Sequence, residues 1–176
     1  SAEVMDVEVD DPSHSFVSNG FVSHNTAMAL ASLCYVWEKN PKEKAIILTT
    51  KSATAQWVGE VDRFTTGVTV LVAAGTKSSR EAAYAAWRAH EGPVIIVAGY
   101  AAFRNDFSLL QDMHGFALIT DEATAYKSDT SRTHQVVFHM AQRASRVWAL
   151  TATLIKNNLM EGHGIYHVVK PGLFGN

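Results

Sequence analysis

Two adjacent carboxylates, Asp121 and Glu122, directly follow an apolar run at residues 116–120. Such a run predicts a buried strand of a parallel sheet, so both acids should lie at the carboxyl end of the strand, where open α/β sheets place their ligands. A carboxylate there can hold Mg²⁺ through water, and its neighbour can polarise the attacking water in phosphoryl transfer. The alternative is a solvated strand-to-helix turn, since Asp-Glu pairs are common.

The segments around the acid pair alternate between short apolar runs and longer stretches with helical spacing. The runs at 45–50, 68–74, 93–99, 116–120 and 147–150 predict strands. Helices are predicted over 26–38, around Trp57 to Phe64, and over 79–90, 103–111, 132–143 and 158–169. Strands that alternate with helices indicate crossover units, and the expected fold class is therefore α/β with a doubly wound parallel sheet.

The composition describes a chain with a core. Of its 176 residues, 47% are apolar and 18% are charged, which excludes a disordered tail. The single cysteine, Cys34, excludes a disulfide framework and is compatible with a reducing cytosol, so a cytoplasmic location is expected. The longest apolar run, Ala27 to Trp37, is too short to span a bilayer, and no membrane partner is expected.

Charge is distributed unevenly along the chain. No Lys or Arg precedes Lys39, and residues 1–25 carry a formal charge of −5, whereas residues 26–176 carry +3. A break of this size predicts two units, 1–25 and 26–176, although an ordinary acidic terminus is the alternative.

Further motifs lie in a fixed order around the acid pair. The stretch ILTTKSATAQWVGEVDRF occupies 47–64, ITDEAT occupies 119–124, LTAT occupies 150–153, and NNLMEGHGIYHVVKPGLFG occupies 157–175. This series resembles the first RecA-like lobe of the Swi/Snf branch of helicase-like, DNA-dependent ATPases, which are P-loop NTPases of superfamily 2. The resemblance covers residues 26–176, and its KPGLFG end is specific.

The resemblance implies a lobe that binds ATP, Mg²⁺ and DNA and works with a second helicase lobe. Asp121 would then bind the magnesium ion, and Glu122 would activate the attacking water. Thr151 and Thr153 would link the nucleotide site to DNA, and Gln56 and Trp57 would face DNA.

A glycine-rich loop ending Gly-Lys-Thr should precede the first helix, because its backbone N–H groups and its Lys hold the phosphates. Thr26 stands where the last residue of that loop belongs, and its hydroxyl would be a magnesium ligand, but residues 21–25 read FVSHN in place of Gly and Lys. Thr124 replaces the usual His of the acid motif, and Leu154 replaces a usual Pro. This chain alone, without the loop and the second lobe with its arginine, is not expected to hydrolyse ATP.

The beginning of the chain carries a second pattern, VMDVEVDDPSHSFVSNGFVSHN at 4–25, followed by Thr26. It resembles the C-terminal end of an intein, which reads YDLxVxxxHxFxxNGxxxHN before a Ser, Thr or Cys of the host. The matching residues are Asp6, His14, Phe16, Asn19, Gly20, His24 and Asn25. Residues 1–25 would then be the last short strands of an incomplete Hint-type domain, and Asn-Gly between apolar pairs predicts a hairpin there.

The intein resemblance gives these residues chemical roles. The side-chain amide of Asn25 would attack its own backbone carbonyl and cut the bond to Thr26, with His24 activating the carbonyl and His14 moving protons. Asp6 would orient or deprotonate the Thr26 hydroxyl, which takes over the upstream host segment before Asn25 cyclises. The implied partner is an N-terminal intein half that carries this host segment; splicing itself needs no cofactor.

Other interpretations remain open. A lone His is often a surface residue, Asn-Gly is often only a turn, and the lobe could be a non-catalytic module that binds DNA or protein without splicing. Lys77, Arg80 and Arg88 could contact DNA phosphates or could form a solvated helix surface.

Overall fold

The computed structural model of the chain describes residues 16–18, 21–23, 25–151 and 159–171. Its centre is a five-stranded sheet in which all neighbouring strands are parallel, in the order β4-β5-β3-β6-β7. The strands are β3 (Lys44–Thr49), β4 (Thr69–Ala73), β5 (Val94–Gly99), β6 (Phe116–Thr120) and β7 (Arg146–Ala149). The prediction of an α/β fold with a parallel sheet is confirmed.

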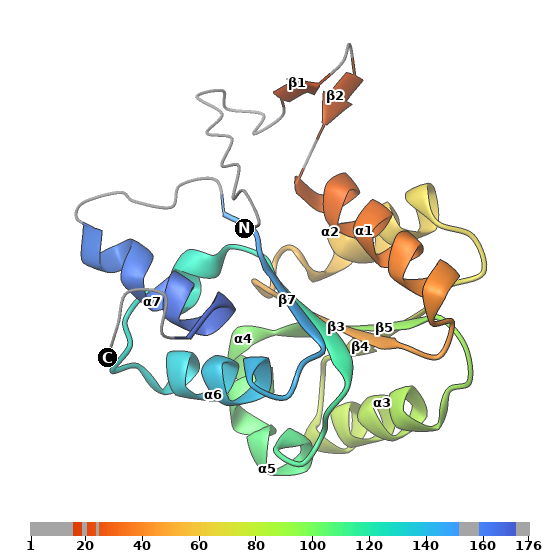
Figure 1. The fold of residues 1–176 in the computed structure, drawn as a ribbon. Coiled ribbons are helices and arrows are strands. Elements are labelled where there is room, and N and C mark those ends of the chain that lie inside the picture. Colours follow the sequence, from red (N-terminus) through yellow and green to blue (C-terminus); the bar gives the residue numbers. More distant parts are fainter. Residues whose placement is uncertain (1–15, 19–20, 24, 152–158, 172–176) are drawn as a thin grey trace.

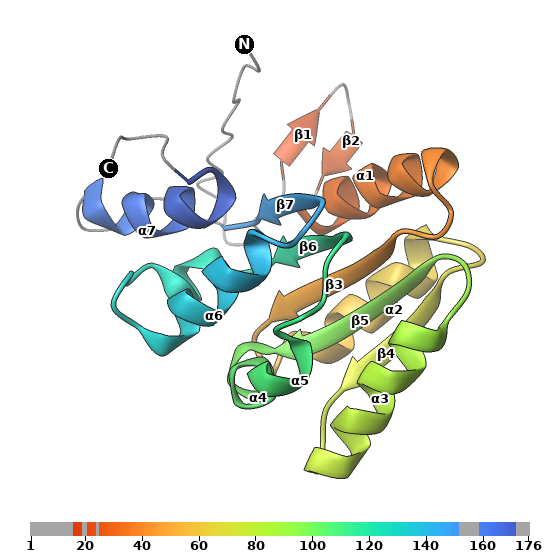
Figure 2. The same ribbon diagram turned by 60° about the horizontal axis from the view of Figure 1, so that its bottom comes forward.

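Helices cover both faces of this sheet (Figures 1 and 2). One face packs against α1 (Asn25–Lys39) and α2 (Thr54–Phe64). The other face packs against α3 (Lys77–Ala89), α4 (Tyr100–Asn105), α5 (Phe107–Leu110), α6 (Arg132–Ala141), α7 (Leu159–Val169) and the 3₁₀-helix η1 (Ala123–Tyr126).

The inner strands read as unbroken apolar runs because both of their faces are buried. Side chains alternate across the sheet, so Ala45 and Ile47 of β3 pack with α1 and α2, while Ile46 and Leu48 pack with the helices of the opposite face. Every residue of β6 is buried. The sheet therefore fixes the positions of whatever follows its strands.

A separate two-stranded sheet lies ahead of α1. β1 (Phe16–Ser18) and β2 (Phe21–Ser23) pair antiparallel, with Val17 opposite Val22. The predicted hairpin strands are therefore present, while Asn19 and Gly20 between them lie outside the described residues.

The helix predicted over 103–111 is in fact two short helices, α4 and α5, which meet at Asp106. Asp106 has ψ of 9°, outside the helical range, and its carboxylate is buried because it binds Arg80. This tertiary contact cannot be read from the local sequence.

The last helix approaches η1 closely. A Cβ built on Gly164 of α7 would collide with the carbonyl group of Lys127, whose carbon would lie 2.8 Å away. His134 of α6 links η1 and α7 by two hydrogen bonds. Its Nδ1 donates to the carbonyl oxygen of Tyr126 in η1 at 3.0 Å, and its Nε2 accepts from Nδ1 of His167 in α7 at 3.3 Å. Burial lowers the pKa of His134, which favours this neutral form.

No helix in the described part of the chain is long and apolar enough to cross a bilayer.

Candidate functional site

The acid pair lies where β6 ends, at the carboxyl edge of the sheet. The backbone N–H of Asp121 donates to the carbonyl oxygen of Leu48 at 2.7 Å, so the ladder between β3 and β6 continues into the first acid. Asp121 is half-buried and Glu122 is exposed. The position predicted for both residues is thus the observed one.

Three hydrogen bonds fix the Asp121 carboxylate. Its Oδ2 accepts from Thr49 Oγ1 at 2.9 Å and from Trp57 Nε1 at 2.7 Å, and its Oδ1 accepts from the backbone N–H of Glu122 at 3.0 Å. Thr49 is fully buried and Trp57 is 2% exposed. Buried donors that point at a carboxylate hold its plane in one orientation, and charge makes such bonds stronger than neutral ones.

Glu122 has a strained backbone. Its φ of 52° and ψ of 54° place it in the left-handed region, and no other non-glycine residue of the described chain has positive φ. This conformation costs about 1–2 kcal/mol for a residue with a Cβ. It turns the chain sharply between β6 and η1 and leaves the Glu122 side chain in solvent beside Asp121.

The hydroxyl groups of two buried tyrosines, Tyr100 and Tyr126, hold this turn in place. The Tyr100 hydroxyl donates to the carbonyl oxygen of Asp121 at 2.7 Å. The Tyr126 hydroxyl donates to Thr120 Oγ1 at 2.8 Å, and the Thr120 hydroxyl in turn donates to the Trp148 carbonyl oxygen at 3.3 Å. Burial is the main cause that raises the pKa of both phenols, so they remain neutral donors. The strained turn is therefore over-determined by its surroundings.

The expectation that Trp57 faces DNA is wrong for its side chain. The indole is buried under α2 and donates to Asp121, whereas its neighbour Gln56 is exposed. Adjacent residues of an α-helix point about 100° apart, so Gln56 can be exposed while Trp57 points into the sheet, and only the packing of α2 decides which of the two is buried. Gln56 keeps the exposure that a ligand contact requires.

The structure places two threonines of the predicted site. Thr26 is half-exposed in the first turn of α1, and Thr151 is half-exposed two residues after β7. The Leu150 N–H donates to the Thr120 carbonyl oxygen at 2.7 Å, so the chain that leads to Thr151 leaves the sheet beside the acid pair. Four further predicted residues, Asp6, His14, His24 and Thr153, lie outside the described residues.

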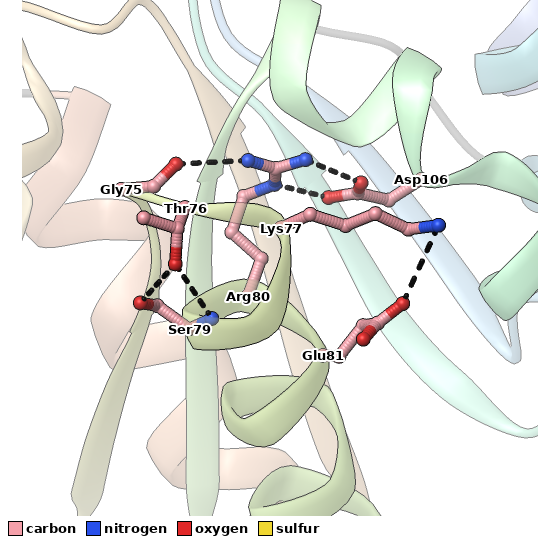
Figure 3. Close-up of polar contacts among 7 residues, drawn as sticks. All are labelled: Gly75, Thr76, Lys77, Ser79, Arg80, Glu81 and Asp106. Atoms are coloured by element: carbon pink, nitrogen blue, oxygen red, sulfur yellow. Dashed lines mark hydrogen bonds and ion pairs between the residues drawn. The ribbon is translucent and has the colours of Figure 1, made fainter.

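Each of the three cations of α3 has a partner within the lobe, and Figure 3 shows those of Lys77 and Arg80. Arg80 grips the buried Asp106 through two bonds of 2.6 and 2.7 Å and also donates to the Gly75 carbonyl oxygen. Lys77 lies 3.7 Å from Glu81, and Arg88 donates to the Leu109 carbonyl oxygen. Arg80 is therefore a structural clamp between α3 and the α4–α5 junction and does not present its guanidinium to a phosphate.

Two residues of the site were missed from the sequence. Thr49 is the last residue of β3 and Tyr100 is the first residue of α4, and neither stands out without knowledge of the strand order. The signal for Thr49 is a hydroxyl at the end of a strand that neighbours the acid-bearing strand. It becomes visible only when β3 and β6 are known to pair.

The fold is an α/β lobe with an oriented carboxylate, that of Asp121, at the carboxyl edge of a parallel sheet, the edge at which open α/β sheets place their ligands. The model of the SNF2-related domain family matches residues 24–176. The chain belongs to this family.

Known proteins agree with this membership. The chain is 32% identical to the "Chromatin-remodeling ATPase INO80" of Kluyveromyces lactis over 138 residues, which cover 73% of the chain and 9% of that protein. It is 28% identical to the mouse "Chromodomain-helicase-DNA-binding protein 1-like" over 150 residues, which cover 85% of the chain and 16% of that protein. The chain thus spans a small part of the length of these relatives.

A solved structure shows the same fold. The "Sulfolobus solfataricus SWI2/SNF2 ATPase core in complex with dsDNA" matches with a TM-score of 0.71 and 21% identity, covering 86% of this chain and 30% of that one.

Proposed function

We propose that the chain is the precursor of a Swi/Snf-type, DNA-dependent ATPase lobe, in which residues 1–25 are the C-terminal segment of an intein. Attack by the Thr26 hydroxyl joins the lobe to an upstream host segment that ends in Gly-Lys, and cyclisation of Asn25 then releases residues 1–25. The joined lobe binds ATP, Mg²⁺ and DNA and is completed by a second helicase lobe.

The proposal rests on one observation: the intein-like pattern and the ATPase-lobe pattern meet at the peptide bond between Asn25 and Thr26. The intein-like pattern ends at Asn25, the family match begins at residue 24, and α1 begins at Asn25. The acidic segment also ends before this point, because its last acid is Asp11 and the next acid of the chain is Glu38. A splicing site at this bond accounts for a phosphate loop that lacks its Gly and Lys immediately before Thr26.

Splicing at the bond between Asn25 and Thr26 takes three steps. The Thr26 hydroxyl attacks the ester or thioester at the upstream junction. The old acyl–oxygen or acyl–sulfur bond breaks, the alcohol or thiol of the N-terminal intein half leaves with the hydroxyl proton, and the host segment is now esterified to the Thr26 oxygen. The Asn25 side-chain nitrogen then attacks the Asn25 carbonyl carbon, the peptide bond to Thr26 breaks, and the Thr26 nitrogen leaves with a proton. Because an ester beside a free amine rearranges to the more stable amide, the host segment ends on the Thr26 nitrogen. His24, His14 and Asp6 supply the acid–base steps that a weak amide nucleophile needs.

The described residues fit a magnesium ion at the acid pair. A carboxylate offers about four lone-pair sites, and three on Asp121 are occupied, so Oδ1 retains one for a metal or its water. Mg²⁺ is usually held by one or two carboxylates together with substrate phosphates. Asp121 and the Thr26 hydroxyl would hold the ion, which would neutralise phosphate charge. Glu122, exposed beside Asp121, would orient the attacking water.

DNA binding draws support from the structural relative, which is described as an ATPase core bound to double-stranded DNA. In this chain Gln56 is exposed next to the Trp57 that holds Asp121. Thr151 follows β7 toward the same edge, and Thr153 is the next threonine along the sequence. We assign these three polar residues to the coupling of DNA with the nucleotide site.

The splicing half of the proposal is tested by incubating the chain with an N-terminal intein half that carries a host segment ending in Gly-Lys. Mass spectrometry should show release of residues 1–25 and a host chain extended at Thr26. Asn25→Ala must abolish release, whereas Asn105→Ala, which changes an exposed asparagine of α4, should leave it intact. Release that persists in Asn25→Ala would contradict the proposal.

The ATPase half is tested on the joined chain with its second lobe. Glu122→Gln should lower ATP turnover by about 10²–10⁴-fold, the range for loss of a general base, and exposed Glu91→Gln should not. The chain before joining should show no turnover. Salt-dependent DNA binding without turnover, unaffected by changes at Asp121 and Glu122, would instead identify a non-catalytic DNA-binding module.

A further inference from the structure

Three histidines lie together where α6 packs against α7, two helices that lie side by side in Figures 1 and 2. His134 comes from α6, and His163 and His167 come from α7, one turn apart. The ring planes of His134 and His167 differ by 9°, with centroids 5.5 Å apart, and those of His163 and His167 differ by 18° at 6.0 Å. Phe138 stacks on His167 at 4.3 Å. The imidazoles therefore form one packed cluster between the two helices.

The positions of the hydrogens between His134 and His167 follow from the group at the far side of His134. A backbone carbonyl only accepts, so Nδ1 of His134, 3.0 Å from the Tyr126 carbonyl oxygen, must carry a hydrogen. In the neutral ring Nε2 then carries none, and it accepts from Nδ1 of His167 at 3.3 Å. One hydrogen atom therefore lies between the two rings.

The bond between the two rings tolerates one added proton but not two. If His167 takes a proton on Nε2, its Nδ1 still donates to His134. If His134 takes the proton on Nε2, His167 can accept from it as its other tautomer, with its own hydrogen on Nε2. When both rings are charged, each of the two facing nitrogens carries a hydrogen, so the bond is lost and two like charges face each other. The two histidines therefore titrate as a coupled pair.

The groups around His134 resist this second proton while α7 is docked. His134 is 3% exposed, and burial is the main cause that lowers its pKa. Both histidines of α7 lower the pKa further, whereas the bond to the Tyr126 carbonyl and the Asp129 carboxylate oppose the shift without reversing it. The titratable and charged groups around the ring come from each neighbouring element: His163 and His167 of α7, the neutral phenol of Tyr126 in η1, Asp129 of the loop before α6, and Arg104 of α4, which donates to Thr133.

The same pair connects α7 to the turn that carries the acids. His134 binds the carbonyl oxygen of Tyr126, and the hydroxyl of this tyrosine binds Thr120, the last residue of β6 before Asp121. Gly164 of α7 lies so close to the Lys127 carbonyl that a Cβ would not fit between them. The docking of α7 and the position of η1 therefore depend on each other.

We infer that the His134–His167 pair is a proton-sensitive latch that holds α7 on η1: the pair stays bonded with no added proton or with one, and a second proton releases α7. Release also removes the contact of Gly164 with Lys127, next to the turn that positions Glu122. The latch goes beyond the proposed function, because it needs neither splicing nor nucleotide. It gives the acid turn a response to pH that a latch of apolar side chains would not have.

Hydrogen exchange of the full chain between about pH 7.5 and pH 5 tests the latch, since histidine changes its charge in this range. The released form binds one proton more than the docked form below its unperturbed pKa of about 6.5, so the released fraction should rise about tenfold per pH unit. Protection of the α7 amides, corrected for the intrinsic rate, should fall accordingly, while α3 amides serve as the reference. Imidazole nitrogen chemical shifts follow the two protonation steps separately. Protection that does not change with pH, or release of α7 with the first proton, would overturn the inference.

His167→Asn separates the latch from a simple effect of burying His134. An asparagine amide can turn to donate or to accept, so it can pair with His134 in either protonation state, and α7 should stay protected in acid. The matched control His163→Asn, one turn away on α7, leaves both nitrogens of the bond in place, so α7 should still be released. Release that persists in His167→Asn would overturn the latch, because the charge on His134 alone would then be its cause. If His167→Asn does not fold, the proton step at which α7 is released in the unchanged chain decides the question.

Discussion

The hydrogen bond from Trp57 to Asp121 offers a quantitative test of the site. Trp57→Phe removes the indole N–H that donates to Oδ2 at 2.7 Å and keeps an aromatic ring in the same buried position. A hydrogen bond to a charged group contributes about 1.5–3 kcal/mol to stability. The smaller ring loses roughly a further 1–2 kcal/mol of apolar contact.

Trp87→Phe is a matched control. Trp87 is also 2% exposed, but its Nε1 donates to a neutral backbone carbonyl, that of Ala45, at 3.0 Å on the opposite face of the sheet. Its loss of apolar contact should be similar, and its hydrogen bond should contribute only about 0.5–1.5 kcal/mol. The two substitutions therefore differ mainly in the charge of the acceptor.

A double-mutant cycle with Asp121→Ala isolates the pair. Urea unfolding followed by far-UV circular dichroism should give a coupling of about 1.5–3 kcal/mol between Trp57 and Asp121. Coupling between Trp87 and Asp121 should lie within about 0.5 kcal/mol of zero, because Ala45 lies near the other end of β3. Asp121→Ala also removes the hydrogen bond from Thr49, but this loss occurs in both variants that carry Asp121→Ala, so it cancels in the coupling energy. A coupling of Trp57 no larger than that of Trp87 would refute the idea that the indole orients the acid.

Two other predictions concern stability. Gly164→Ala should destabilise the lobe by about 1–3 kcal/mol in urea unfolding, because the added Cβ would overlap the Lys127 carbonyl group. The control Gly59→Ala, which places a Cβ in open space on α2, should stabilise the lobe by about 0.5–1 kcal/mol. Equal effects of the two substitutions would contradict the close approach of α7 to Lys127. Burial lowers the pKa of His134 in the folded protein, so the unfolded chain binds the proton more readily. The free energy of unfolding should therefore be highest above the unfolded pKa of about 6.5 and should decline as the pH falls below it. His134→Asn should flatten this decline in unfolding curves between neutral and mildly acid pH, and exposed His114→Asn should leave it unchanged.

The sequence was sufficient for those features that depend on local pattern. Unbroken apolar runs predicted all five strands of the sheet within one or two residues, because an inner parallel strand is buried on both faces. The position of Asp121 and Glu122 followed directly, since it depends only on where β6 ends.

What could not be predicted depends on long-range contacts. Trp57 and Gln56 are neighbours in the sequence, yet one is buried against Asp121 and the other is exposed. Arg80 is a cation on a helix that looked solvated, and its partner Asp106 lies on another element. Such pairings appear only when the strand order brings distant segments together, and no single-residue pattern encodes them.

The bonds that hold Asp121 are all formed within residues 26–176. They come from Leu48, Thr49, Trp57, Tyr100 and Glu122. The acid site is therefore preorganised without the upstream segment, and its strain at Glu122 is held by buried donors rather than by a ligand. If splicing at Asn25 and Thr26 takes place as proposed, it adds a phosphate-binding loop to a lobe whose acid site is already formed. The hydrogen bonds of Asp121 should then be the same before and after joining, because every donor to its carboxylate lies after Thr26 in the sequence.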